Sequence, residues 1–561
     1  MKEVRDHHGV AAVVVAWAVL AATAFAFAAP RTDAPGLYYD EAFMAQQARD
    51  FLEPERATDH AGSIRELWIA GRPFPLRNAV YLGSLKSQLL IPSFAIFGAE
   101  PSVLRLTTLG WSLLAVLFVM LFARRIVGTP AAIASGALLI GDPAWYFYSL
   151  HEWGPFTTGL LCRGAGLWLV TLGWSERRVA ALAAGGLALG LGVYNRADFA
   201  VILAAAALAL AAAAPAVLRE AWRERRRDAV ILLLALAVGA APMLVSAGEL
   251  LATGSSAALE SRGGLEEKLR VLGSLLDGSR FYRVIDQGGL FPRMHESTAP
   301  ASLLPWLLLA AAVAAAWRGA RRTAGGRAPG AETFLLLAAL LTSLGMLAVP
   351  GAVRAHHLLN ALPFPHLLLA SVSVRAWRAA GSRPAVRTVV PILIRLGLVA
   401  ALAALAISSL RVSAATYALI DATGGRGRFS TALHDLAREI DGDPEQRVVS
   451  LDWGFHEPLL FLTDDTVLVQ PLWRIPLAVR QRGAWTHDGQ PGDLYLVHAD
   501  AYDLFGHSAR FLRTAQHLGE REPGAVELRD YRDREGSPVF TTIRITRPHR
   551  IVLRPTGFRI E

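Results

Sequence analysis

Ionisable side chains that can exchange protons or hold anions gather beside the apolar stretches of this sequence. Asp40 and Glu41 open a segment, residues 41–52, whose pattern predicts an amphipathic helix. Carboxylates and histidines can serve as acids or bases, and clustered cations can neutralise an anionic ligand. The full set comprises Asp40, Glu41, Lys86, His151, Glu152, Arg163, Arg196, Arg354, His356 and His357. A functional site built from these residues is therefore the first hypothesis.

Each of these residues also has a purely structural interpretation. Asp40 is placed to cap the N-terminus of the helix that follows it, because Asp is a favoured cap residue. Lys86 can extend its ammonium towards the membrane interface, and the paired residues 151–152 and 356–357 can be ordinary interfacial side chains. Arg163 lies about seven residues, roughly 10 Å, inside an apolar stretch, where it needs a partner or an anionic ligand.

Composition excludes most classes of soluble protein. The chain has 561 residues, of which 53% are hydrophobic and 18% charged, and its mean hydropathy is +0.36. The net charge of +9 comes from arginine clusters between apolar runs, which is the pattern of membrane topology and predicts no nucleic-acid partner. The lone Cys162 cannot form an intrachain disulfide. No cluster has the ligand spacing of a metal site, so the sequence predicts no metal-ligating residues. It indicates no certain cofactor, and metal dependence stays open.

The apolar runs predict eleven membrane spans, because each is close to the roughly 20 residues that cross a bilayer core. We place them at residues 9–29, 102–123, 130–148, 156–174, 179–195, 197–214, 229–250, 301–317, 332–349, 355–373 and 388–409. Arginine clusters fall on alternate links, which predicts a cytoplasmic N-terminus and an external C-terminus. A cleaved signal peptide is an alternative for the first span, since residues 26–28 have the small-x-small form.

Three regions are too polar to span the membrane: residues 30–101, 251–300 and 410–561. The last alternates strand-like runs, such as 448–451 and 494–497, with an amphipathic helix at 431–440. The predicted fold is a polytopic α-helical membrane domain, residues 1–409, followed by a small external α/β domain, residues 410–561. The first outer loop, 30–101, carries Asp40, and 251–300 forms a second large outer loop.

Several segments together resemble the GT-C superfamily of membrane glycosyltransferases, and within it glycosyltransferase family 39, which contains protein O-mannosyltransferases and lipid A aminoarabinose transferases. The likeness lies in Tyr38-Tyr39-Asp40-Glu41-Ala42-Phe43, in 81–86 and in the Pro-Gly pattern of 91–98. Residues 151–155, 194–199 and the stretch from His356-His357 to Pro363-Phe364-Pro365 look like further markers of bacterial members. The resemblance covers about 10–410 and leaves out the tail.

The resemblance implies transfer of a sugar from a polyprenyl-phosphate carrier to an acceptor at the outer face of the bacterial inner membrane. Asp40 matches the position of the catalytic acidic residue, with Glu41 beside it. Lys86 matches a loop lysine that meets the donor phosphate, Arg196 occupies a basic position near it, and we add Arg163 as a third phosphate contact. His151 and Glu152 stand where some members carry a second acidic motif, but one carboxylate with a histidine departs from a paired-acid metal site.

Two other classes of function remain open at this point. A secondary transporter or lipid flippase also needs many spans, although such proteins usually carry inverted repeats and mid-membrane charges. A noncatalytic assembly or sensor protein would use its tail to bind a partner. The sequence identifies neither the sugar nor the acceptor, which can be a lipid, a glycan or a protein.

Overall fold

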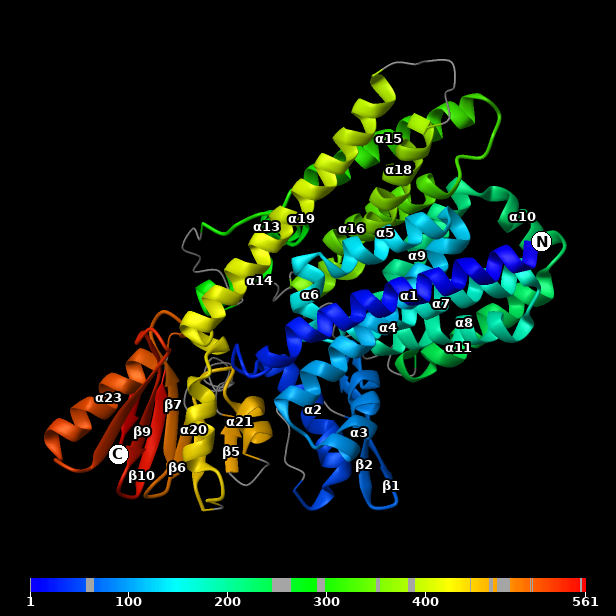
Figure 1. The fold of residues 1–561 in the computed structure, drawn as a ribbon. Coiled ribbons are helices and arrows are strands. Elements are labelled where there is room, and N and C mark those ends of the chain that lie inside the picture. The colour runs from blue at the N-terminus through cyan, green and yellow to red at the C-terminus, as the bar shows by residue number, and fades with distance from the viewer. Residues whose placement is uncertain are drawn as a thin grey trace.

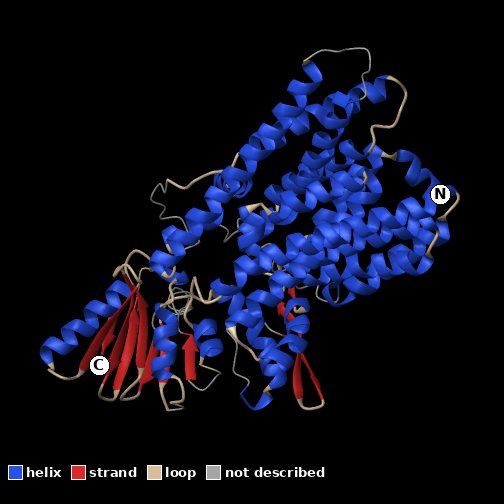
Figure 2. Cartoon of the chain, in the orientation of Figure 1, coloured by secondary structure: helices blue, strands red, loops and turns tan. Residues whose placement is uncertain are grey.

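The computed structural model describes residues 2–56, 65–244, 264–289, 298–349, 354–381, 389–443, 445–463, 468–471, 485–504, 506, 508–554 and 557–561. A long bundle of helices forms one part of the molecule, and a domain with most of the strands packs at one end of it (Figure 1; Figure 2). The fold is a polytopic membrane protein with a small C-terminal domain, as the sequence predicts.

Every predicted span corresponds to helix in the structure, although two of them are broken. The bundle contains α1 (Lys2–Ala28), α4 (Pro101–Val127), α5 (Thr129–Ile140), α6 (Pro143–Leu150), α7 (Phe156–Glu176), α8 (Val179–Asn195), α9 (Phe199–Ala213), α10 (Pro215–Arg223), α11 (Arg226–Leu244), α15 (Leu304–Ala324), α16 (Ala331–Ala348), α17 (Ala355–Leu358), α18 (Phe364–Gly381) and α19 (Val390–Thr423). The end of the seventh predicted span, 245–250, lies outside the described residues.

The number of spans is lower when helix length and apolarity are both required. Six helices in the described part of the chain are long and apolar enough to cross a membrane, and a seventh arises if α9 and α10, bent by 99°, form one span. The eleven predicted spans are therefore not confirmed as a count. The predicted span 130–148 is two helices, α5 and α6, because Pro143 lacks an N–H and Asp142 caps the second helix by accepting from the backbone N–H of Ala144 at 2.8 Å.

The first outer loop folds into a helix, a small sheet and a second helix. These are α2 (Tyr39–Leu52), β1 (Arg65–Ile69), β2 (Arg72–Ala79), β3 (Leu82–Gly83) and α3 (Leu85–Phe97), with the strands antiparallel in the order β1-β2-β3. From the predicted second loop the structure describes α13 (Leu265–Leu276) and α14 (Arg280–Gln287). The flanking parts, 251–263 and 290–297, lie outside the described residues.

The C-terminal domain is an α/β domain built on a five-stranded sheet. Its elements are α20 (Ala432–Ile440), β4 (Arg447–Ser450), α21 (His456–Leu462), β5 (Leu468–Pro471), β6 (Trp485–Gly489), β7 (Leu494–His498), α23 (Ser508–Arg521), β8 (Val526–Arg532), β9 (Pro538–Ile545), β10 (His549–Arg554) and β11 (Gly557–Ile560). The sheet order is β5-β4-β7-β9-β8, with β5, β4 and β7 parallel, and β6, β10 and β11 form a second sheet. Alternate side chains fill two cores, since Val448 and Leu496 face one and Val449 and Tyr495 the other.

The boundary of this domain lies later than the sequence predicts. The last helix of the bundle, α19, continues without a break past residue 409 and ends at Thr423, where Gly424 adopts a left-handed conformation with φ of 68°. Buried Val412, Thr416 and Ile420 continue its packing face, so the helical pattern outlasts the hydrophobic span. Residues 410–423 therefore belong to the helix.

Candidate active site

Asp40 is the second residue of α2 and its carboxylate does not cap that helix. The cap residue is Tyr38, whose backbone N–H donates to the Glu41 carboxylate at 3.4 Å. The structural interpretation of Asp40 as a helix cap is therefore wrong. Among the described residues, no donor makes a hydrogen bond to the Asp40 side chain.

The electrostatic environment of Asp40 suits a base that works near neutral pH. Burial raises the pKa of its carboxyl to about 6, while Arg354 and Lys86 act to lower it and Glu41 raises it further. The carboxylate is thus mostly ionised at pH 7 and still basic enough to take a proton.

Glu41, the neighbour of Asp40, is part of a buried ion pair. Its side chain is 1% exposed and receives two bonds from Arg105 of α4, Nε to Oε2 at 2.9 Å and Nη2 to Oε1 at 3.2 Å. Arg105 also donates to the carbonyls of Thr32 at 2.7 Å and Pro35 at 2.9 Å. This arrangement anchors the start of α2 to the bundle, and it favours a scaffolding role for Glu41. In the sequence, Arg105 is marked only as a charge in the first turns of an apolar helix.

Lys86 lies in the first turn of α3 and is paired across the site with Glu152. Its Nζ is 3.0 Å from Glu152 Oε2, and both side chains are 1% exposed. Glu152 is in turn oriented by Thr157, whose hydroxyl donates to Oε1 at 2.6 Å. The ammonium therefore stands buried near Asp40, where interfacial snorkelling does not account for it.

Arg196 joins three segments at the turn between α8 and α9. Its Nε is 2.7 Å from Asp198 Oδ1, and its Nη2 donates to the carbonyl of His356 at 2.9 Å. The other oxygen of Asp198 bonds to His357 Nδ1 at 2.7 Å. Arg196 Nη1 is buried and has no partner among the described residues. Asp198, two residues after Arg196 in the same turn, therefore links Arg196 to His357.

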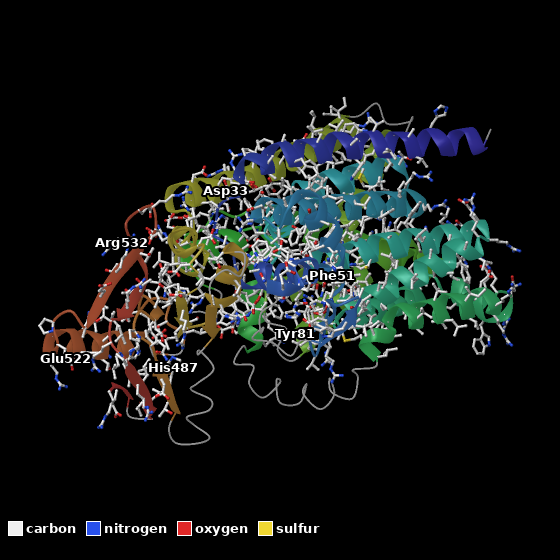
Figure 3. All side chains as sticks on the ribbon, turned by 90° about the horizontal axis from the view of Figure 1, so that it is seen from below. Asp33, Phe51, Tyr81, His487, Glu522 and Arg532 are labelled. Atoms are coloured by element: carbon white, nitrogen blue, oxygen red, sulfur yellow. The ribbon has the colours of Figure 1, made fainter. Side chains whose placement is uncertain are left out.

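The first outer loop closes directly onto this turn. The backbone N–H of Ala197 donates to the carbonyl of Tyr81 at 3.0 Å, and Leu82 forms an isolated bridge with Arg196. A Cβ at Gly83 would collide with the carbonyl of Tyr194, so this close approach requires glycine. Figure 3 labels Tyr81 on this loop, with Asp33 nearer the C-terminal domain. The contact brings the Arg196 turn to the side of the loop that carries Lys86.

Arg163 holds the link between α17 and α18. Its Nη1 donates to the backbone carbonyls of Asn360 and Leu362, and its guanidinium lies 6.0 Å from the ring centre of Phe199. The side chain is 1% exposed. The Nη1 contacts fit the structural alternative, while the buried Nε and Nη2 have no partner among the described residues.

The remaining predicted residues flank the same region. His151 is fully buried against Phe281, with ring centres 5.4 Å apart, and neither ring nitrogen has a partner among the described residues. The His356 and His357 rings are 4.4 Å apart, and His356 packs on Gly154. Arg354 precedes α17 and acts on Asp40 through its charge. In the described part of the chain, no three His, Cys, Asp or Glu side chains are grouped closely enough to hold a metal ion.

Comparison with known proteins points to one family of membrane enzymes. Residues 89–245 match the family model described as dolichyl-phosphate-mannose-protein mannosyltransferase. No curated protein matches the sequence. ArnT from Cupriavidus metallidurans bound to undecaprenyl phosphate is 14% identical, with a TM-score of 0.50 over 95% of this chain and 97% of that one.

Two further solved structures resemble the chain. Apo ArnT from the same organism is 13% identical, with a TM-score of 0.48 over 96% of this chain and 98% of that one. The archaeal oligosaccharyltransferase AglB from Archaeoglobus fulgidus, in complex with an inhibitory peptide and a dolichol-phosphate, is 14% identical, with a TM-score of 0.49 over 83% of this chain and 65% of that one.

The likeness to undecaprenyl-phosphate-bound ArnT corrects one expectation from the sequence. It leaves only 5% of this chain uncovered, whereas the tail is more than a quarter of the chain, so the shared fold includes most of the C-terminal domain. The chain therefore shares the fold of a polytopic membrane protein with a small C-terminal domain, and residues 89–245 resemble the matched mannosyltransferase family.

Proposed function

We propose that this protein transfers a sugar from a polyprenyl-phosphate donor to an acceptor hydroxyl at the outer face of a bacterial inner membrane, with Asp40 as general base. The observation that carries the proposal is the placement of the Asp40 carboxylate. It does not cap the helix, and it lies close enough to Lys86 and Arg354 for their positive charges to lower its pKa. A base beside a phosphate-binding site is what this reaction requires.

In the proposed reaction Asp40 accepts the proton of the acceptor hydroxyl while that oxygen attacks the anomeric carbon of the sugar. The bond between the anomeric carbon and the phosphate oxygen breaks, and the polyprenyl phosphate leaves with the bonding electron pair. Attack opposite the leaving group inverts the anomeric configuration. Cations beside the leaving oxygen stabilise the charge that develops there, and a site closed to water favours transfer over hydrolysis.

Lys86 and Arg196 are the proposed contacts for the donor phosphate. Lys86 is held by Glu152 at 3.0 Å and therefore keeps one fixed position. Arg196 has its Nε and Nη2 occupied, which leaves the buried Nη1 to reach an anionic group. Charge-assisted bonds of this kind are about twice as strong as neutral ones. Arg163 acts instead on the Asn360 and Leu362 carbonyls.

The gathering of basic links at one end of the bundle supports the proposed orientation. Arg125 of α4 pairs with Glu176 of α7, and Arg225 donates to the carbonyl of Trp174 at 2.6 Å. Figure 1 shows the N-terminus beside α10, at the end of the bundle away from the C-terminal domain. Basic links mark the cytoplasmic face of inserted helices. Asp40 and the C-terminal domain then lie on the outer face.

The direct test uses purified protein in liposomes, radiolabelled polyprenyl-phosphate sugars and a lipid and glycan fraction as acceptor. We expect label to move from at least one donor to an acceptor in the parent protein, and no transfer in the matched Asp40→Asn variant. A lipid flippase would move donor across the bilayer without making product. Transfer by Asp40→Asn protein at the parent rate would refute Asp40 as the base.

A further inference from the structure

The C-terminal domain holds α2 at both of its ends. Before the helix, the backbone N–H of Gly36 donates to the carbonyl of Phe429 at 2.6 Å, and that of Leu37 donates to His434 Nε2 at 3.0 Å. At the other end, buried Arg49 donates to the carbonyls of Phe461 at 2.9 Å and Leu460 at 2.6 Å. The helix that carries Asp40 is therefore fixed from a part of the chain about 400 residues away.

One turn of the C-terminal domain reaches the start of this helix. The Trp453 turn, residues 451–455, connects β4 to α21. The Trp453 ring centre lies 4.8 Å from that of Tyr39 and 5.7 Å from that of Tyr38. Tyr38 is itself enclosed, since it stacks on Phe429 at 4.8 Å. Trp453 thus covers the two residues that immediately precede Asp40.

The Trp453 turn is held in one conformation by a buried charge network. Asp452 Oδ2 receives bonds from Arg428 Nη2 and from His498 Nδ1, both at 2.8 Å. Asp452 Oδ1 accepts from the backbone N–H of Trp453 at 2.8 Å, and Arg428 Nε donates to the Trp453 carbonyl at 3.0 Å. Burial lowers the pKa of His498 to about 4, so the ring is neutral at pH 7 and its one N–H is committed to Asp452. Breaking these buried hydrogen bonds would cost too much free energy for the turn to change its conformation.

We propose that the C-terminal domain is a positioning element of the active site, and that Trp453 holds Tyr38 and Tyr39 so that Asp40 faces Lys86 and Arg354. This inference rests on the proposed role of Asp40. An isolated helix of 14 residues is only marginally stable in water, so the place where α2 begins depends on its tertiary contacts. Trp453 also covers this end of the site against water, which preserves the buried environment of Asp40. Trp453 is a positioning residue, since it acts through the two tyrosines.

The test compares Trp453→Ala, Trp453→Leu and Trp453→Phe in the full-length protein. Trp68→Ala is the matched control, because Trp68 is 64% exposed on β1, where it pairs with Pro73 of β2. We expect Trp453→Ala to lower kcat by tenfold to a hundredfold, the order seen when a reacting group is displaced by about 1 Å. Binding of undecaprenyl phosphate changes less than twofold, because its proposed contacts, Lys86 on α3 and Arg196 between α8 and α9, lie outside the C-terminal domain. Trp453→Phe restores most of kcat, and Trp68→Ala behaves like the parent.

A second readout separates positioning from general destabilisation. The groups that act on Asp40 are Glu41, Lys86 and Arg354, and none of them is changed in the Trp453 variants. Removing the ring admits water, so the acid limb of the rate profile moves to lower pH, towards the usual range of a carboxyl. If Trp453 had only a structural role, replacing it would change the melting temperature and leave the acid limb of the rate profile at the same pH. Trp453→Leu keeps an apolar side chain and supplies the same measurement if the alanine variant does not fold.

The outcomes separate the positioning role of Trp453 from the proposed catalytic role of Asp40. If Asp40→Asn is inactive while folded Trp453→Ala or Trp453→Leu keeps both the parent kcat and the parent acid limb, the positioning role is refuted and the catalytic role stands. If Asp40→Asn retains full activity, the proposed function itself fails, whatever the Trp453 variants do.

Discussion

Lys86 and Glu152, 66 residues apart in the chain, form a buried ion pair in which Nζ and Oε2 are 3.0 Å apart and both side chains are 1% exposed. The pair crosses from the first outer loop to the link between α6 and α7. Removing one member of such a pair leaves an uncompensated buried charge, which typically costs about 3–5 kcal/mol, whereas removing both costs far less.

This pair gives the first prediction. Lys86→Met destabilises the protein strongly, and the double variant Lys86→Met/Glu152→Gln recovers most of the melting temperature. Binding of undecaprenyl phosphate stays weakened by about tenfold or more in both, because each has lost the cation proposed to meet the phosphate. Thermal unfolding and lipid binding in detergent measure the two effects. Recovered binding in the double variant would show that Lys86 is a scaffold alone.

Arg196 and Arg163 are expected to behave differently although both are buried arginines. Arg196→Ala weakens donor binding by about tenfold or more, since it removes the Nη1 proposed to meet the phosphate. Arg163→Ala lowers the melting temperature, because the carbonyls of Asn360 and Leu362 lose their donor, while the folded fraction binds donor normally. If both variants lose donor binding equally, measured per folded molecule, Arg163 also contacts the phosphate.

Asp40 variants are predicted to lose turnover and keep their stability. Asp40→Asn and Asp40→Ala both lose about a hundredfold or more in kcat, the scale of a positioned general base. Neither should unfold earlier than the parent near pH 7, since Tyr38 and Glu41 cap α2 and the substitution removes a charge that is costly to bury. Thermal unfolding provides the control. A marked drop in melting temperature for Asp40→Ala alone would reinstate the capping role.

The pH profile follows from the pKa of Asp40, which burial raises to about 6. The base must be ionised, so kcat/KM is level above about pH 7 and falls tenfold per pH unit well below 6. Lys86 lowers this pKa, so the Lys86→Met/Glu152→Gln variant moves the acid limb to higher pH. The contribution of Asp40 to stability changes with pH in the opposite direction to its contribution to activity. A raised pKa in the folded state stabilises the parent relative to Asp40→Asn below the usual carboxyl pKa, and this advantage is lost as the pH rises through 6.

Topology is testable with reporter fusions at the two chain ends. We predict a cytoplasmic signal at the N-terminus and an external signal at Glu561, because the basic links gather at the end of the bundle away from Asp40. Two external signals would indicate a cleaved first segment, for which N-terminal sequencing is the control. A cytoplasmic signal at Glu561 would contradict an outer-face site.

Local pattern predicted the elements well and the contacts between them poorly. The apolar runs located the helices of the bundle, and the strand-like runs 448–451 and 494–497 located β4 and β7 in the tail. The predicted span 130–148 missed the break before Pro143, although Gly141-Asp142-Pro143 contains a cap and a helix start. The hydrogen bonds from Arg49 to the Leu460 and Phe461 carbonyls could not be predicted. Donor and acceptors are more than 400 residues apart, and backbone carbonyls have no signature in a sequence.

The same limit applied to the site. Asp40, Lys86 and Arg196 stood out as charges beside apolar segments, but a list of charges does not say which of them neutralise one another. Glu41 and Asp40 are adjacent, yet one meets Arg105 and the other faces Lys86 and Arg354, since consecutive residues of a helix point about 100° apart. Only the fold assigns those directions.

The unbroken α19 has a mechanical consequence. Its 34 residues give a rod about 51 Å long, whereas the apolar core of a bilayer is about 30 Å thick. Towards its C-terminal end the helix is held by two contacts: the Tyr417 hydroxyl donates to that of Tyr146 at 2.8 Å, and Arg31 lies 4.7 Å from the Tyr417 ring centre. Under the proposed function, the length of α19 sets how far the C-terminal domain stands from the lipid surface, and so limits the size of an acceptor that fits between the two.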